Sequence, residues 1–277
     1  MGTVKNGLII GLSILLMVSV SACISQKEPT PEALVKAIED VDKYTFTMEY
    51  YSKYPNLTKM AQNTTIKIRG GFNFDREEAF WETSLFREDG SITYSNGTIL
   101  GDFVYYSFAI EKKGMIIQKD SVNMTIREYF EKLKDNFVPK IETPEDLKYQ
   151  MLKGADLNRN PLYYLRDILK NTTNFEAARG DGLYLVGFNF TRRYELPMPE
   201  NVSGNLKDYF ETIRWIETTR GFARVWVKDN LPIKGEIHAT KFIERPGLNM
   251  TSTIEISAKF EITYDYKRPE WIKKVIE

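Results

Sequence analysis

The single cysteine of this 277-residue chain is the residue best suited to do chemistry, and its surroundings restrict what that chemistry is. Cys23 has no second cysteine with which to form an intramolecular disulfide, and one thiol cannot build a cysteine-cluster zinc site. It follows an apolar run, Leu8–Val18, and a group of small residues that ends at Ala22. A thiol is a strong nucleophile, so a cysteine in this place is suited to accept a covalent lipid.

The four residues Val20-Ser21-Ala22-Cys23 resemble the lipobox of prokaryotic lipoproteins, whose cysteine is lipidated and becomes the mature N-terminus. Lys5 and the apolar run after it have the order of a secretion signal. The resemblance implies a signal peptide over residues 1–22 and a lipidated cysteine with its tether over residues 23–31. We therefore expect a chain anchored by lipid on the extracytoplasmic face of the cell membrane.

Two alternatives to lipidation stay open. Cys23 could be a stray thiol in an ordinary cleavage region. The stretch of residues 7–24 also approaches the roughly 20 apolar residues that span a bilayer, so an uncleaved transmembrane anchor is the other alternative.

Acceptor sequons of the type Asn-x-Ser/Thr are a second indication of location. They begin at eight of the 16 asparagines, more than composition alone accounts for: Asn56, Asn63, Asn96, Asn123, Asn171, Asn189, Asn201 and Asn249. Dense sequons are not typical of bacteria, so together with the lipobox they indicate an archaeal cell-surface lipoprotein. A Thr-rich strand protein would collect some of the eight without any glycosylation.

No residue constellation in the sequence predicts catalysis. Lys plus Arg and Asp plus Glu both total 38, so no net charge attracts the chain to nucleic acid, and we expect no nucleic-acid partner. His238 is the only histidine, so a multi-histidine metal centre is excluded, and it falls on the expected solvent face of a strand. No phosphate loop, serine elbow, metalloprotease helix or calcium loop occurs. We expect no enzyme, no metal and no cofactor.

The folded part of the chain begins with helical signals. Thr30-Pro31-Glu32 supplies an N-cap, a proline at the first helical position and an acid in the first turn, which predicts a helix over residues 31–42. Apolar residues three or four apart predict three more helices in the middle of the chain, at residues 126–135, 144–153 and 161–170, and a further helix near residues 206–216.

Residues with a period of two predict many antiparallel strands. The runs are 44–50, 64–74, 79–86, 91–95, 98–110, 115–119, 183–190, 222–228, 232–243 and 250–266. Asn96-Gly97 predicts a tight hairpin between two of them. In the last run apolar and polar residues alternate from Ile254 to Asp265, so the sheet has one wet face. No composition break divides residues 32–277, which we expect to form a single domain.

The small residues Gly235 and Ala239 on the inward side of one strand would leave a concave apolar space suited to a hydrophobic ligand. The residues expected to line it are Phe46, Met48, Gly235, Ile237, Ala239, Ile256, Ala258 and Phe260. The alternative is that bulky neighbours, such as Trp226 or Phe260 itself, fill the space.

Three segments resemble the LolA/LppX-type lipoprotein-carrier superfamily: the helix of residues 31–42 with the strand after it, Ile68-Arg-Gly-Gly-Phe-Asn-Phe74, and Val225-Trp-Val-Lys-Asp-Asn-Leu-Pro-Ile-Lys234. The resemblance covers most of residues 31–272. It implies an α+β fold, in which a strongly curved antiparallel half-barrel follows the signal segment and helices cover its concave face. It also implies binding or transport of lipid-like molecules without catalysis. The alternative function is a glycosylated envelope or interaction protein that has no ligand cavity and whose protein partner is unknown.

Overall fold

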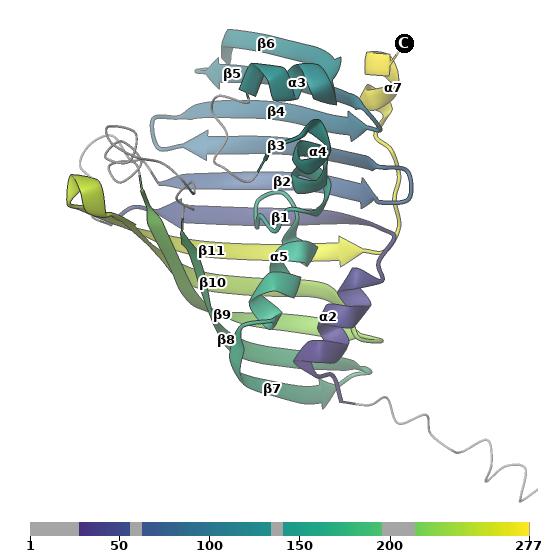
Figure 1. The fold of residues 1–277 in the computed structure, drawn as a ribbon, viewed down its shortest axis with the longest axis vertical. Helices are drawn as coiled ribbons and strands as arrows, with labels where there is room; N and C mark the ends of the chain where they lie inside the picture. Colours follow the sequence, from purple (N-terminus) through teal and green to yellow (C-terminus); the bar gives the residue numbers. More distant parts are fainter. Residues whose placement is uncertain (1–27, 56–62, 134–140, 196–213, 277) are drawn as a thin grey trace, which may run out of the picture.

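Eleven strands form one open antiparallel sheet in the computed structural model, which describes residues 28–55, 63–133, 141–195 and 214–276 (Figure 1). Their order across the sheet is β6-β5-β4-β3-β2-β1-β11-β10-β9-β8-β7. The strands are β1 (Lys43–Lys53), β2 (Thr64–Asn73), β3 (Glu78–Arg87), β4 (Ser91–Leu100), β5 (Phe103–Lys112), β6 (Met115–Thr125), β7 (Thr172–Gly180), β8 (Leu183–Glu195), β9 (Ile216–Lys228), β10 (Leu231–Arg245) and β11 (Met250–Thr263).

The strand order is that of two meanders joined side by side. β1 to β6 run in sequence toward one edge and β11 back to β7 toward the other, and the two sets meet where β1 pairs with β11 from Thr45↔Thr263 to Lys53↔Glu255. Helices α3 (Ile126–Leu133), α4 (Pro144–Lys153) and α5 (Pro161–Leu169) carry the chain from edge strand β6 to edge strand β7 across one face (Figure 1). α2 (Pro31–Glu39) lies on that same face.

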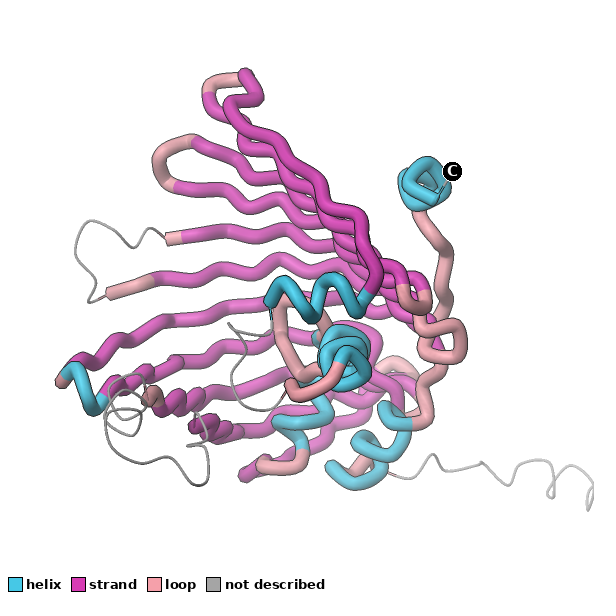
Figure 2. The backbone as a smooth tube through the Cα atoms, turned by 45° about the horizontal axis from the view of Figure 1, so that its top comes forward, coloured by secondary structure: helices cyan, strands magenta, loops and turns pink. Residues whose placement is uncertain are grey.

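We call the face that carries α2 to α5 the inner face and the opposite one the outer face. Figure 2 shows the sheet curving around these helices. This arrangement is compatible with the predicted half-barrel, since the sheet is antiparallel, curved and not closed.

The main core lies between the inner face and the helices. Alternate residues of β1, including Tyr44, Phe46 and Met48, are buried there. The helices contribute their apolar stripes to the same cluster: Leu34 and Ile38 from α2, and Leu162, Leu165 and Ile168 from α5.

The helix starts follow the predicted capping logic. Thr30 accepts a hydrogen bond from the Ala33 amide at α2, Thr143 forms a capping box with Asp146 at α4, and a proline occupies the first turn in both. The three central helices predicted from the sequence are confirmed as α3, α4 and α5. The predicted first helix is confirmed as α2, which ends at Glu39 instead of residue 42. The helix predicted near residues 206–216 lies mostly outside the described residues, and β9 already begins at Ile216.

The hairpin predicted at Asn96-Gly97 is wrong. β4 runs straight through these residues, with Asn96 opposite Glu82 and Gly97 opposite Trp81, and neither has the positive φ that a type I′ turn requires. The chain turns later, at Gly101, whose φ is 57°.

A short helix lies on the outer face, where no helix was expected. In α7 (Glu270–Ile276), Ile272 is fully buried, and the Trp271 indole Nε1 donates to Glu82 Oε1 at 2.6 Å. Trp81 donates a hydrogen bond to the carbonyl of Arg159 on the inner face. Since successive side chains of a strand point to opposite faces, Glu82 points to the outer face. The helices therefore do not all cover the concave face, and Figure 2 shows the C-terminal helix apart from the others.

Candidate functional site

A cavity of about 680 Å³ lies on the inner face, between β3 to β5 on one side and α3, α4 and residues 154–159 on the other. We call it the inner cavity. Its apolar and aromatic wall includes Trp81, Val104, Tyr106, Tyr129, Leu147 and Met151. A concave site with such a wall and a few polar groups is the usual form of a small-molecule pocket.

Strand register explains why this part of the inner face is hollow. Gly97 lies between Trp81 on β3 and Tyr106 on β5, and all three border the cavity. A Cβ at Gly97 would come no closer than 3.5 Å to Trp81 and 3.6 Å to Tyr106, so the missing side chain leaves unfilled space. Tyr106 is 46% exposed, which is unusual for an aromatic residue on the core side of a sheet.

Polar groups gather at the end of the cavity formed by residues 156–159 and the end of β8. They include Gln150, Asp156, Asn158, Arg159 and Arg192. Asp156 Oδ1 accepts a hydrogen bond from the backbone N–H of Asn158 at 2.9 Å. The side-chain Oδ1 of Asn158 is buried and has no hydrogen-bond partner among the described residues. The Arg192 guanidinium carbon lies 5.4 Å from the centroid of the Tyr164 ring, and burial raises the pKa of Tyr164 to about 12.

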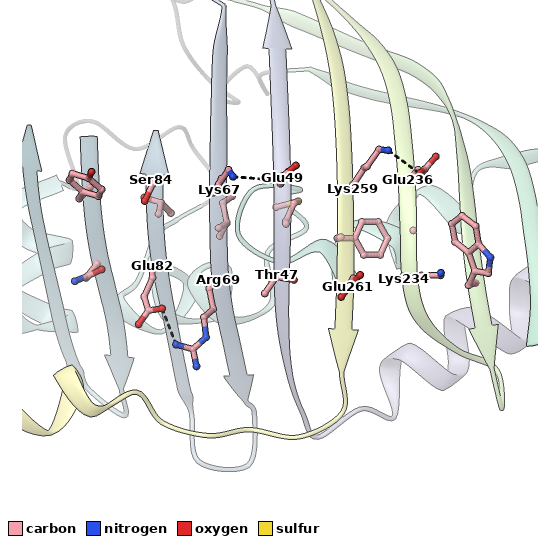
Figure 3. A pocket seen from close by; sticks show the side chains of 18 residues that line it. Thr47, Glu49, Lys67, Arg69, Glu82, Ser84, Lys234, Glu236, Lys259 and Glu261 are labelled. Carbon is pink, nitrogen blue, oxygen red and sulfur yellow. Dashed lines mark hydrogen bonds and ion pairs between the residues drawn. The ribbon is translucent and has the colours of Figure 1, made fainter. Parts of the chain in front are cut away.

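A second hollow, of about 890 Å³, lies on the outer face across β1 to β4 and β9 to β11 (Figure 3). We call it the outer groove. Its wall is charged, and the charges are paired with one another. Lys67 Nζ lies 3.2 Å from Glu49, Arg69 Nη1 3.1 Å from Glu82, and Lys259 Nζ 3.3 Å from Glu236. Lys234 Nζ lies 4.7 Å from the centroid of the Trp226 ring.

The inner cavity is the better candidate, although the outer groove is larger. Cross-strand ion pairs are what a solvent-facing sheet surface carries, and most of the outer groove's charges already have partners. A ligand there would have to displace them. The inner cavity offers aromatic surface and polar atoms whose hydrogen-bonding capacity is not used.

The eight residues predicted to line a cavity are buried, and none of them borders the inner cavity. Met48, Gly235 and Phe260 are among the residues that line the outer groove. Phe46, Met48, Ile237, Ala239, Ile256 and Ala258 pack in the core cluster with the helices. The ring of Phe260 occupies the space that a Cβ at Gly235 would need. The space expected beside Gly235 is therefore filled by Phe260, as the alternative reading of the sequence allowed.

The structure places six of the eight sequons, and all six lie at the surface. Asn123, Asn171, Asn189 and Asn249 are exposed, while Asn63 and Asn96 are half-buried. By strand register, Asn96 opposite Glu82 and Asn189 opposite Phe222 point to the outer face, and Asn123 lies on edge strand β6. Cys23, Asn56 and Asn201 lie outside the described residues.

Within the described residues, no group of His, Cys, Asp and Glu is arranged to hold a metal ion. His238 stacks on Phe222 on the outer face, with ring centroids 5.0 Å apart. The helices of the described residues include none with the length and apolarity to cross a bilayer.

The residues of the inner cavity were missed because their signal was misread. Trp81, Val104 and Tyr106 lie in predicted strands. Gly97 is a glycine that leaves space on the inner face, which is the same feature on which the cavity beside Gly235 was predicted. Because Gly97 follows an asparagine, it was assigned to a turn instead of to a strand.

No protein-family model matches the chain, and no curated protein matches it. Among solved structures, a beta-barrel-like protein of the domain of unknown function DUF1849 from Brucella abortus is 7% identical, with a TM-score of 0.27 over 82% of this chain and 98% of that one. A DUF1329 family protein from Desulfovibrio piger ATCC 29098 is 8% identical, with a TM-score of 0.26 over 88% of this chain and 96% of that one. At these TM-scores the likeness assigns neither a family nor a function to this chain.

Proposed function

We propose that this chain is a non-catalytic lipoprotein, held on the extracytoplasmic face of the membrane, that binds a lipid-like ligand in the inner cavity. The observation that supports the proposal most directly is the unfilled space between the sheet and α3 and α4, bordered by Trp81, Val104, Tyr106 and Met151. Acyl chains suit such a wall because burying apolar surface contributes about 25 cal/mol for each Å² removed from water.

The space at Gly97 allows a direct test by filling the cavity. A Gly97→Leu side chain would enter the inner cavity, and its Cβ would meet only ordinary van der Waals contacts. We expect this variant to lose most of the binding of a fluorescent fatty-acyl probe, measured by titration, because the added side chain takes the place of the probe.

Gly187→Leu is the matched control, since Gly187 also lies within a strand but opposite Arg224 on the outer face, where a Cβ would meet nothing within 4 Å. It should bind the probe as the unsubstituted protein does. Equal binding by all three proteins would contradict the proposed site, and equal loss in both variants would attribute the effect to glycine replacement in a strand.

The anchor is a separate part of the proposal and has its own test. Cys23→Ser keeps the apolar segment but removes the nucleophile that would take up the lipid. We expect an unprocessed precursor on a denaturing gel, with no incorporation of a radiolabelled lipid precursor. Normal maturation and membrane retention of this variant would refute lipidation.

The rival function, a glycosylated surface protein that acts through a protein partner, is supported by the surface positions of the six described sequons. This function would be favoured over lipid binding if the protein were recovered with a protein partner in a fixed ratio and its inner cavity bound no probe.

A further inference from the structure

We propose that the ligand of the inner cavity is an anionic amphiphile, whose acidic head group is bound by Arg192 and Arg159 and whose chain lies along the aromatic wall. This inference rests on the proposed function and adds the chemical class of the ligand. The shared chemistry of the head group is a carboxylate or a phosphate, the two groups that a guanidinium binds in bidentate fashion.

Arg192 reaches the cavity from β8 with its hydrogen-bonding capacity largely unused. The nearest carboxylate oxygen is Asp167 Oδ2, 3.7 Å from Arg192 Nη2, which is beyond hydrogen-bond distance. Asp167 is held more closely by its neighbour Arg166, whose Nη2 lies 2.9 Å from Oδ1. Arg192 is therefore held by the Tyr164 ring and by a long ion pair with Asp167, while its guanidinium N–H groups make no hydrogen bond to the described residues.

Arg159 supplies a second positive charge at the same end of the cavity. Its backbone carbonyl accepts the Trp81 indole N–H at 3.1 Å, which fixes the backbone of residue 159 beside the aromatic wall. Its guanidinium has no carboxylate partner among the described residues. Because the segment is held in place, the guanidinium extends from a fixed point at the cavity border.

The charges that border the inner cavity do not balance. Arg159 and Arg192 contribute two positive charges and Asp156 one negative charge, so the lining carries one net positive charge. Asp167, which pairs with Arg192 from outside the lining, is shared with Arg166 and does not cancel both arginines. In the outer groove three ion pairs cancel at 3.1 to 3.3 Å. An excess positive charge beside an apolar wall favours a ligand with one acidic group and one apolar chain.

The neutral amide side chains at this end can serve as donors or acceptors, so the choice of an acid rests on the two arginines. Gln150 can donate from its side-chain amide nitrogen, whereas the Asn158 side chain already forms a hydrogen bond with Tyr50. The lining thus combines the charged donors of the two arginines with neutral groups that can bond a neighbouring hydroxyl or water.

Competition binding with ligands that share one chain tests the inference. The full-length protein is loaded with the fluorescent acyl probe, which is then displaced by oleate, by oleyl alcohol and by oleoyl lysophosphatidate. We expect the two acids to compete at least tenfold better than the alcohol, since only the acids can form charge-assisted hydrogen bonds with the guanidinium groups. The better of the two acids identifies the head group as carboxylate or phosphate.

The variant Arg192→Gln should lose at least about tenfold in competition by the acids and change little for the alcohol, while Arg192→Lys should fall between them. Arg220→Gln is the control, because Arg220 is exposed on the outer face, opposite Thr191 and Thr240. Equal loss for acid and alcohol in Arg192→Gln would overturn the inference and make Arg192 a structural residue. Equal competition by all three ligands in the unsubstituted protein would overturn it too, whereas no displaceable probe binding at all would overturn the proposed function.

Discussion

Asn160 is the buried polar residue that ties the helices to the sheet. Its Oδ1 accepts from the Tyr44 hydroxyl of β1 and from the Tyr163 amide at 3.0 Å, and its Nδ2 donates to the Leu152 carbonyl at 3.0 Å. The side chain thus caps α5, holds the end of α4 and bonds to β1 at once. A buried network of this kind is stabilising only while every member keeps its partner.

Tyr44→Phe removes one hydroxyl from this network and keeps the aromatic packing. We expect the free energy of unfolding in denaturant to fall by about 1 to 2 kcal/mol, because an Asn160 acceptor site loses a buried donor. Tyr51→Phe, on the opposite face of the same strand and 40% exposed, should cost almost nothing. A Tyr44→Phe protein as stable as the parent would show that the bond contributes no stability.

The ionisation of Tyr44 makes the free energy of unfolding depend on pH. Burial raises the pKa of Tyr44 well above its usual value of 10, so the folded state keeps the proton that the unfolded state loses. The stabilising contribution is complete below about pH 10 and falls as the pH rises above it. The slope of this alkaline loss should be shallower in Tyr44→Phe than in Tyr51→Phe.

At the scale of elements, local sequence predicted most helices and strands and failed where neighbours decide. The capped segments after Thr30 and Thr143 became helices, and the alternating run before Asp265 became β11. β7 was not predicted because, as an edge strand, it is exposed along most of its length and shows little apolar alternation. Asn96-Gly97 was misassigned because pairing with β3 and β5 outweighed its turn propensity.

The outer-face helix α7 allows a test of element packing within a single turn. Ile272 is fully buried and Ile276 is 53% exposed, so the two isoleucines differ mainly in what surrounds them. Ile272→Ala should lower the free energy of unfolding by about 2 to 5 kcal/mol, through lost burial and the cavity left behind.

Ile276→Ala should change that free energy by less than about 0.5 kcal/mol. Both values come from chemical denaturation followed by tryptophan fluorescence, to which Trp271 in the same helix contributes. A similar small effect for both variants would mean that α7 is not packed on the sheet in solution.

At the scale of the molecule, the pairing of β1 with β11 unites the two meanders, and it joins segments about two hundred residues apart that no local signal connects. The position of the cavity follows from that global arrangement. Sequence could predict an apolar inner face from alternation along single strands, but not where the helices leave it unfilled. The core that they cover includes the predicted residues Ile237 and Ala239, while space is left at Gly97.

The described sequons fit the same division of faces. Those placed within strands point outward or lie on an edge, so glycans at Asn96, Asn123 or Asn189 would leave the inner cavity free. An amphiphile could therefore reach a cavity on the side of the molecule opposite the strand sequons Asn96 and Asn189.

Native mass spectrometry of the full chain, purified gently from the cells that produce it, is the most direct test of lipid binding. Lipid binding in the inner cavity predicts a 1:1 complex with a ligand mass that is released on denaturation and is absent in Gly97→Leu but present in Gly187→Leu. A chain recovered without any such ligand, or with the same ligand mass in both glycine variants, would contradict it.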